Sequence, residues 1–377
     1  MEQVFVKKVH HGHPWIFSNE VTRPLPALEP GVVVSVFHKQ KFIGNGFYNP
    51  RSLIAIRIFS DKNVEFDKQL VADALKNASR QRQTLNENSY RLVNSESDGL
   101  PGLVIDKYED VYVIQIHALG IDQRKSIIID ALVDLKPIAI YEKSESSFRE
   151  LEGITTNNGL INGKLNEPVM IEQDEKKFLV NIIEGQKTGF FFDLRDIRRK
   201  FAGYASGRKV LDLFCYTGGF ACYAGKAGAA SVLGIDSSRK ALELAIENRS
   251  LNGLDRIEFN CSDIHDFFYA DKEKYDLIVL DPPSFTKTKK NVRQAQKGYW
   301  AVNRQAMKRL SDNGILFTTC CSYHFSEEEF EKTVAQAAAD AHCRFRIIDR
   351  LDQGLDHPVL LGMPESRYLK CLVLEKR

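Results

Sequence analysis

The sequence predicts an α/β protein in which a doubly wound parallel sheet forms the C-terminal half, preceded by a small β domain and an α+β domain. Three observations support this prediction. Short apolar runs separated by turn residues fill the N-terminus, mixed helical and strand patterns follow, and strands and helices alternate four times after Lys209. The predicted domains are residues 1–64, 65–180 and 181–377.

The composition is that of an ordinary globular protein. The chain has 377 residues and a formal net charge of +2, so the charge balance alone does not indicate nucleic acid binding. Its seven cysteines show no C-x-x-C spacing, and their odd number argues against a complete disulfide scheme. No stretch is apolar enough to span a bilayer and the N-terminus lacks a signal peptide's apolar core, so we expect a soluble cytoplasmic protein.

The first two domains are predicted from short strand-like runs and two helical patterns. Strands are expected at residues 32–37, 41–48, 53–59, 90–93, 103–107, 111–117 and 138–142, and helices at 66–82 and 127–135. His10, His11 and His13 cluster near the N-terminus. They have no cysteine or carboxylate at ligand spacing, so we assign no metal.

Residues 209–236 form the centre of the third domain and predict a strand, a glycine turn, a helix and a second strand that ends on Asp236. An acid at that place binds the ribose hydroxyls in nucleotide-binding βαβ units. The turn has neither the G-x-G-x-x-G of dinucleotide folds nor a phosphate loop. S-adenosylmethionine, which carries adenosine but no phosphate, therefore fits, although any βα turn of a doubly wound fold can contain two glycines.

Polar or reactive residues follow five predicted strands of this domain. The carboxyl ends of parallel strands meet at one edge of a sheet, where ligands bind. We therefore predict a cofactor site at this edge. Its expected members are Asp212, Phe214, Cys215, Tyr216, Gly218, Gly219, Asp236, Ser237, Asp263, Asp281 and Pro282.

Asp281-Pro282-Pro283 is the most specific short signal. The prolines remove two N–H groups and fix the turn, which holds the carboxylate beside a methyl donor, as in methyltransferases that act on nucleobases. A plain strand-terminating turn is the alternative. We expect Asp281 to protonate or hydrogen-bond N3 of a cytosine as charge develops.

Cys320-Cys321-Ser322 narrows the reaction further. Cytosine C5 becomes nucleophilic only after a thiolate adds at C6, and a cysteine at a neighbouring strand tip can do this. The alternative is that both thiols are buried small hydrophobes. The pattern leaves the choice between Cys320 and Cys321 open, and it does not identify the base that removes the C5 proton, although His324 is close in sequence.

The loop over residues 285–293 places lysines and an arginine beside Phe285. Such a loop suits a phosphate backbone next to a stacking base, and a solvated lysine loop is equally compatible with the pattern.

Long spaced segments resemble the bacterial large-subunit ribosomal RNA cytosine-C5 methyltransferase family with an N-terminal PUA domain. The resemblance covers nearly the whole chain and rests on HGHPWIFSNE and GFYNPRSLIAIRIFS for the PUA module, and on GQKTGFFFDLRDIRR, LDLFCYTGGFA, DPPSF, CCS and DHPVLLGMPESRYLK for the catalytic part. It implies a class I methyltransferase fold, an RNA-binding middle domain, S-adenosylmethionine as donor and ribosomal RNA as partner.

The same resemblance implies roles for individual residues. The cysteine directly before serine is the family's nucleophile, which corresponds to Cys321, and the extra Cys320 departs from the family pattern. Residues implied to lie over the cofactor are Gln186, Lys187, Thr188, Phe192 and Asp193.

Two further hypotheses stay open. A related branch with a similar D-P-P-x-F signal methylates guanine nitrogens in RNA and needs no cysteine. The other hypothesis is a PUA-bearing RNA-binding protein with a vestigial methyltransferase fold, against which the intact acids Asp212, Asp236, Asp263 and Asp281 argue. No membrane partner is expected, and a homodimer is left open.

Overall fold

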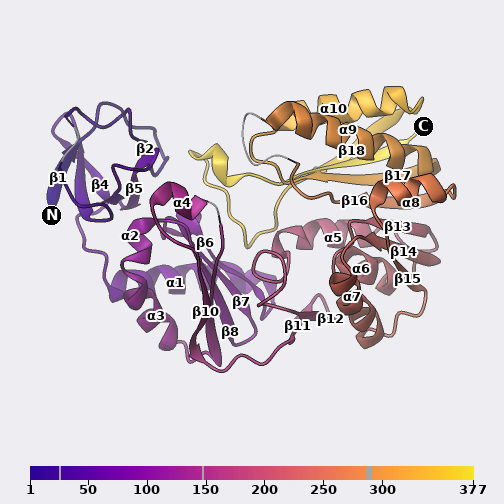
Figure 1. Cartoon of the computed structure of the whole chain (residues 1–377), viewed down its shortest axis with the longest axis horizontal. Helices are drawn as coiled ribbons and strands as arrows, with labels where there is room; N and C mark the ends of the chain where they lie inside the picture. Colours follow the sequence, from indigo (N-terminus) through magenta and orange to yellow (C-terminus); the bar gives the residue numbers. More distant parts are fainter. Residues whose placement is uncertain (25–26, 147, 286–290) are drawn as a thin grey trace. The chain divides into compact units, whose positions relative to one another are not determined.

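The computed structural model of the chain describes residues 1–24, 27–146, 148–285 and 291–377 (Figure 1). These residues divide into two compact units. Unit 1 consists of Met1–Ile171, Val180–Phe192 and Leu355–Ser366, and unit 2 consists of Glu172–Leu179, Asp193–Gly354 and Arg367–Arg377. The chain therefore leaves unit 1 and returns to it twice. The predicted domain boundaries after residues 64 and 180 stay predictions.

Unit 1 begins with a five-stranded sheet in the order β1-β3-β4-β5-β2. Its strands are β1 (Glu2–Phe5), β2 (Trp15–Phe17), β3 (Val33–His38), β4 (Lys41–Tyr48) and β5 (Ile54–Ser60). The three predicted strands are confirmed as β3, β4 and β5. The sequence analysis missed β1 and β2, because four and three residues are too few for an alternating pattern to show.

A second sheet of unit 1 has the order β10-β9-β8-β7-β6. Its strands are β6 (Tyr90–Asn94), β7 (Leu103–Tyr108), β8 (Val111–Ile116), β9 (Ala139–Ser144) and β10 (Asn157–Gly163). The helices are α1 (Lys68–Arg82), α2 (Leu119–Asp122), α3 (Lys125–Val133) and α4 (Phe148–Glu152), with 3-10 turns η1 (Gln83–Leu85) and η2 (Ser95–Asp98). Phe47 and Phe59 of the first sheet join the apolar cluster around Leu75 and Ile114, so the two sheets share a core.

Unit 2 is built on a seven-stranded sheet in the order β15-β14-β13-β16-β17-β19-β18. Its strands are β13 (Lys209–Leu213), β14 (Ser231–Asp236), β15 (Ile257–Cys261), β16 (Tyr275–Leu280), β17 (Leu310–Cys320), β18 (Phe345–Leu351) and β19 (Lys370–Lys376). The first five are parallel, as predicted, whereas β19 pairs antiparallel with β17 and β18. A separate two-stranded sheet consists of β11 (Val169–Gln173) and β12 (Lys176–Val180).

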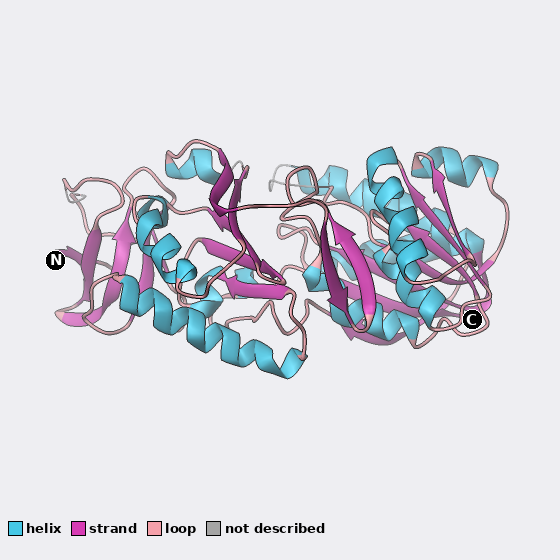
Figure 2. Cartoon of the chain, turned by 90° about the horizontal axis from the view of Figure 1, so that it is seen from below, coloured by secondary structure: helices cyan, strands magenta, loops and turns pink. Residues whose placement is uncertain are grey.

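Helices cover both faces of the seven-stranded sheet. They are α5 (Arg195–Ala202), α6 (Gly219–Lys226), α7 (Arg239–Leu251), α8 (Ile264–Ala270), α9 (Val292–Arg309) and α10 (Glu327–Asp340), and the 3-10 turn η3 (Phe192–Leu194) precedes α5. A further 3-10 turn, η5 (Pro364–Ser366), belongs to unit 1. On one face α6 packs between α5 and α7, and on the other α9 packs between α8 and α10. Figure 2 shows the strands of this sheet flanked by helices. The sheet is therefore doubly wound, as the sequence predicts.

Local signals decide where these helices begin and end. Helix α10 begins with a capping box, because Ser326 Oγ accepts from Glu329 N and the Glu329 carboxylate accepts from Ser326 N. Helix α6 ends at Lys226, since Gly228 adopts a φ of 85°. No helix in the described ranges is both long and apolar enough to cross a bilayer.

Candidate active site

The carboxyl ends of the five parallel strands of unit 2 lie at one edge of its sheet. The parallel pairings of β13, β14, β15, β16 and β17 make this necessary. The predicted residues of these tips, from Asp212 through Cys321, are therefore brought to a common edge. From β13 the chain order continues to β14 and β15 on one side, and β16 and β17 lie on the other side. Ligands bind beside such a reversal of strand order in open α/β sheets.

The turn after β13 is held by its own hydrogen bonds. Phe214 and Tyr216 adopt φ angles of 63° and 49°, which are uncommon for non-glycine residues. Cys215 N donates to Ile235 O at 3.0 Å and Gly218 N donates to Cys215 O at 2.8 Å. Because these N–H groups are already used, the turn is poorly suited to cradle a phosphate, in agreement with the choice of a phosphate-free cofactor.

Gly218 and Gly219 are required by packing within unit 2. Gly218 has a φ of 77°, and a Cβ there would lie 2.8 Å from the Phe259 ring. A Cβ on Gly219 would lie 2.8 Å from Nε of Arg198. The glycines thus let an aromatic ring and a guanidinium approach the turn closely, which the sequence pattern alone did not reveal.

Asp236 is fixed at the tip of β14 by two backbone donors. Its Oδ2 accepts from Tyr216 N at 2.9 Å and its Oδ1 accepts from Ser238 N at 2.8 Å. Each oxygen keeps lone-pair capacity for a further donor. Ser237 follows and is exposed. Asp236 therefore has the geometry that the ribose hypothesis requires.

Asp263 has a structural task at the next strand tip. It is exposed and is the N-cap of α8, where its Oδ1 accepts from His265 N at 2.7 Å. This capping role accounts for an acid at that position without a ligand.

Asp212 is the most strongly perturbed acid of the edge. It is fully buried, and its Oδ2 accepts from Ala221 N at 2.9 Å. Its Oδ1 has no hydrogen-bond partner among the described residues. Burial raises the pKa of this carboxyl to about 8; Asp281 and Asp236 add to the rise, whereas the Ala221 N–H and Arg198 oppose it.

Arg198 of α5 is a site residue that the sequence analysis missed. It is buried, and its guanidinium interacts electrostatically with Asp193, Asp212 and Asp281. Burial lowers the pKa of Arg198 and these acids raise it. Asp193 also accepts from Tyr368 OH at 2.6 Å. A basic residue on a short helix is usually solvated, so the sequence does not indicate that Arg198 is buried. Its position among the acids is visible only in the structure.

Hydroxyl groups join the loops after β16 and β17. Thr319 Oγ1 donates to Asp281 Oδ1. Ser322 Oγ lies 2.9 Å from Ser284 Oγ and 2.9 Å from Tyr299 OH. The Asp281 turn and the Cys-Cys-Ser turn are therefore held together, and Pro282 is buried.

The two adjacent cysteines have different surroundings. Cys320 is fully buried in the apolar core of unit 2, and burial raises the pKa of its thiol. Cys321, one residue beyond the end of β17, is half-buried. All seven cysteines belong to the described residues and none is in a disulfide. Only Cys321 of this pair is partly accessible.

The residues implied to lie over the cofactor fall into two groups. Asp193 belongs to unit 2, whereas Gln186, Lys187, Thr188 and Phe192 belong to unit 1. Thr188 is fully buried, and its hydroxyl donates to Asp106 and lies 2.9 Å from Tyr108 OH. Its hydrogen bonds go to unit 1 side chains.

The neighbouring residues of that segment also pack locally. The Phe192 ring lies 5.1 Å from that of Tyr108, and the Lys187 ammonium lies 4.4 Å from the Phe191 ring centroid. Gln186 O accepts from Gly189 N at 2.8 Å. Thr188 and Phe192 are therefore buried residues that hold the segment 186–192 against Tyr108.

Two other parts of the sequence analysis have separate outcomes. Of the predicted RNA loop, residues 286–290 lie outside the described residues, and the Phe285 ring packs against Tyr299 at 4.8 Å. His10 and His13 hydrogen-bond to Glu20 at 2.6 Å and Glu365 at 3.1 Å. Within the described ranges, no group of three or more His, Cys, Asp or Glu side chains could hold a metal ion.

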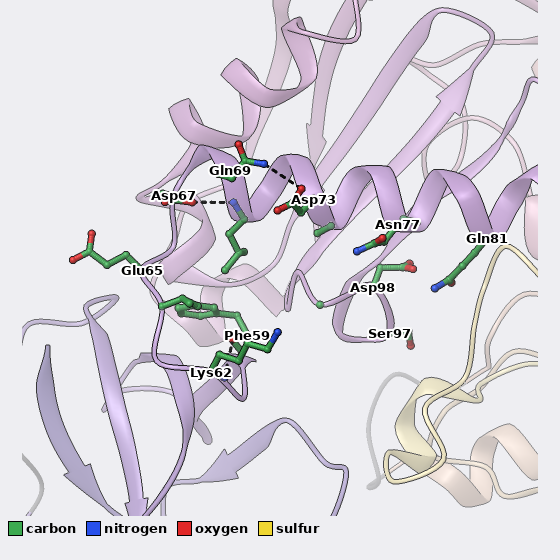
Figure 3. Close-up of a pocket in the computed structure, with 16 residues that line it drawn as sticks. Phe59, Lys62, Glu65, Asp67, Gln69, Asp73, Asn77, Gln81, Ser97 and Asp98 are labelled. Carbon is green, nitrogen blue, oxygen red and sulfur yellow. Dashed lines mark hydrogen bonds between the residues drawn. The ribbon is translucent and has the colours of Figure 1, made fainter.

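A pocket of about 720 Å³ lies in unit 1, and none of its lining residues is a predicted site residue (Figure 3). Its acids have local tasks: Asp67 caps α1, Asp73 accepts from Gln69 at 3.1 Å, and Asp98 pairs with Arg82. The labelled side chains of Figure 3 show these acids along α1 and η2. We therefore assign this pocket no part in the chemistry.

Comparison with known proteins identifies the family. An S-adenosylmethionine-dependent methyltransferase family model matches residues 156–362, and a PUA-like domain model matches residues 2–61. The ribosomal RNA large subunit methyltransferase I of Shewanella frigidimarina is 39% identical, covering 97% of this chain and 96% of that protein. The protein of the same name from Aliivibrio fischeri is 37% identical over 97% of this chain and 95% of its own.

A solved structure agrees at the level of the fold. The crystal structure of SMU.776 complexed with SAH has a TM-score of 0.86 and 23% identity, and covers 100% of both chains. The fold is therefore that of a class I, Rossmann-like methyltransferase preceded by a PUA-like domain. By family match and by full-length relatives, the chain belongs to the ribosomal RNA large subunit methyltransferase I family of S-adenosylmethionine-dependent methyltransferases.

Proposed function

We propose that this enzyme methylates C5 of a cytosine in 23S ribosomal RNA through a covalent adduct between Cys321 and C6 of the base. The observation that carries this proposal is the position of Cys321: it leaves the core at the tip of β17, on the strand next to that of Asp281. The names of the relatives support ribosomal RNA as the substrate.

The strand-tip residues of unit 2 suit S-adenosylmethionine. Asp236 would accept from the ribose hydroxyls, because both its oxygens are oriented by backbone donors. Asp212 offers a buried oxygen without a partner among the described residues, in surroundings rich in acids, which favours a cationic ligand. When bound, the cofactor supplies a methyl group on a positively charged sulfur and leaves as neutral S-adenosylhomocysteine.

The chain's own residues carry the rest of the reaction. The Cys321 thiolate gives an electron pair to C6 of the cytosine, and the C5–C6 π pair moves to C5, which then takes the methyl group. Asp281 protonates or hydrogen-bonds N3 while charge accumulates on the ring. A base then removes the C5 proton; the C5–C6 double bond re-forms as the C6–S pair returns to the thiolate.

Variants at the two cysteines test the proposal. Purified wild type, Cys321→Ala and the matched control Cys320→Ala are incubated with 23S ribosomal RNA from a deletion strain, and the digested nucleosides are weighed by mass spectrometry. We expect 5-methylcytidine from wild type and Cys320→Ala and none from Cys321→Ala, with S-adenosylmethionine binding retained in all three by calorimetry.

Other outcomes point to the other hypotheses. Full product from Cys321→Ala would remove the covalent mechanism. A methylguanosine as the sole product would transfer the protein to the guanine branch. Absence of S-adenosylmethionine binding by the wild type would favour a PUA-bearing RNA-binding protein with an inactive fold.

A further inference from the structure

Lys370 is a buried cation beside the Cys-Cys-Ser turn. It is the first residue of β19 and pairs with Cys320 across the antiparallel ladder, so both side chains lie on the same face of the sheet. Only 9% of Lys370 is exposed. Its Nζ donates to Ser322 O at 2.9 Å and to Tyr368 O at 3.2 Å. The ammonium thus holds the turn that contains Cys321.

The charge of Lys370 has no carboxylate partner. Among the described residues no Asp or Glu oxygen lies within salt-bridge distance of its Nζ. Its strongest electrostatic neighbours are the thiols of Cys320 and Cys321, with Glu327 and Arg367 weaker. A buried cation without an anion is costly, and backbone carbonyls offset only part of that cost. The groups next to Lys370 that can become anionic are the two cysteines.

Accessibility separates these two cysteines. Cys320 is fully buried, and Tyr299 and Ser322 hydrogen-bond to it. Tyr299 is itself buried and neutral, since burial raises the pKa of its hydroxyl. Cys321 is half-buried at the strand tip. A substrate base can therefore approach only the second thiol.

We propose that Lys370 is a positioning residue of the reaction: it holds the Cys-Cys-Ser turn through Ser322 O and stabilises the thiolate of Cys321 with its ammonium charge. This inference rests on the proposed function, because it acts through the proposed nucleophile. The Lys370 charge raises the fraction of Cys321 that is thiolate at neutral pH, and the thiolate is the form that attacks C6. Titratable groups near Cys321 include Cys320, which precedes it on β17, and Tyr299 on α9 and Lys370 on β19, which both interact with it electrostatically; His324 follows three positions later in the sequence.

The test measures the pH dependence of Cys321 alkylation by iodoacetamide, with mass spectrometry to localise the adduct, in a Cys320→Ala background. Lys370→Gln keeps a donor for Ser322 O but removes the charge, and Lys370→Arg keeps the charge. We expect Lys370→Gln to move the alkylation midpoint upward by about one pH unit or more and Lys370→Arg to restore most of it. Methyl transfer by Lys370→Gln should fall about tenfold near neutral pH and recover as pH rises, with little change in KM for RNA.

The results distinguish the inference from the proposed function. An unchanged midpoint in a Lys370→Gln protein that still binds S-adenosylmethionine overturns the role of Lys370, even when Cys321→Ala is inactive. If Lys370→Gln fails to fold, the pH profile of Lys370→Arg decides. An alkylation midpoint of Cys321 in folded Lys370→Arg that is as high as in a denatured control also overturns the role of Lys370. Full activity of Cys321→Ala removes the proposed function itself, whatever the midpoints are.

Discussion

Unit 1 and unit 2 each bury a group of charged side chains, and the two groups differ in how completely their carboxylates are hydrogen-bonded. In unit 1, Asp106 Oδ1 accepts from Arg91 Nε at 2.8 Å, and Asp106 Oδ2 accepts from Arg91 Nη2 at 2.9 Å and from Thr188 Oγ1. In unit 2, Asp212 has one backbone donor on Oδ2 and no partner for Oδ1 among the described residues.

The difference separates a structural ion pair from the carboxylate that we propose to lie in the cofactor site. A fully hydrogen-bonded buried pair is a structural element, and removing one member leaves the other unpaired. A buried carboxylate that lacks donors destabilises the protein unless a ligand supplies them. The Asp106 group thus holds the segment that contains Thr188, while Asp212 keeps one acceptor oxygen that no described residue uses.

The largest expected effect is at Asp281. Asp281→Ala removes the group that we propose to contact the base, and we expect turnover to fall by a factor on the order of 10³ or more. The initial rate of methyl transfer to ribosomal RNA measures this. Asp276→Asn, at the opposite end of β16, is the matched control and should stay active. An active Asp281→Ala would place the reacting base elsewhere.

The next largest effect concerns the Asp106–Arg91 pair of unit 1. Asp106→Asn leaves the Arg91 guanidinium without its carboxylate, so we expect the free energy of unfolding to drop by about 3 kcal/mol. Urea unfolding of the full chain measures the change. A loss below about 1 kcal/mol would mean that the Arg91 pair is no more than a surface-type ion pair.

Substitution of Asp212 is expected to stabilise the protein, whereas substitution of Asp106 destabilises it. Its pKa is about 8 in the folded protein against 3.8 ordinarily, so the folded state binds the extra proton between these values. The associated stability is present below about pH 4 and is lost as pH rises through about 8. The side chain introduced by Asp212→Asn does not titrate. The free energy of unfolding of the variant should therefore rise relative to that of wild type, by an amount on the order of a few kcal/mol, between about pH 5 and about pH 8.

Urea unfolding of both proteins without cofactor, at several pH values in this window, measures the Asp212 effect. The charged groups that face Asp212 are Asp281, Asp236 and Arg198, and they are the same in both proteins. A stability difference that does not change with pH would show that Asp212 is already ionised in the folded state, and the contrast with Asp106 would disappear.

The smallest effect is at Thr188. Thr188→Val removes one hydroxyl between Asp106 and Tyr108, and we expect a loss of about 1 to 2 kcal/mol in unfolding free energy. Thr188→Ser, which keeps the hydroxyl, is the control. A loss of cofactor affinity in Thr188→Val without any loss of stability would instead favour direct contact with the cofactor.

Periodicity and turn chemistry were sufficient for the parallel core of unit 2. The tip residues Asp212, Asp236 and Asp281 lie at one edge, as predicted, because parallel strands end together. Antiparallel β18 and β19 were missed, since an edge strand such as β18 shows little apolar alternation. The two returns of the chain to unit 1, at Val180–Phe192 and Leu355–Ser366, have no local signature at all.

The sequence by itself determined the alternation of strands and helices in the parallel core of unit 2, the phosphate-free turn and the residues at the strand tips, because these depend on neighbours within about ten positions along the chain. Only the tertiary structure decided which of two adjacent thiols is accessible, that Arg198 lies among three acids, and that Lys370 supports the turn of Cys321. Burial and charge pairing arise between segments far apart in sequence, so no local pattern contains them.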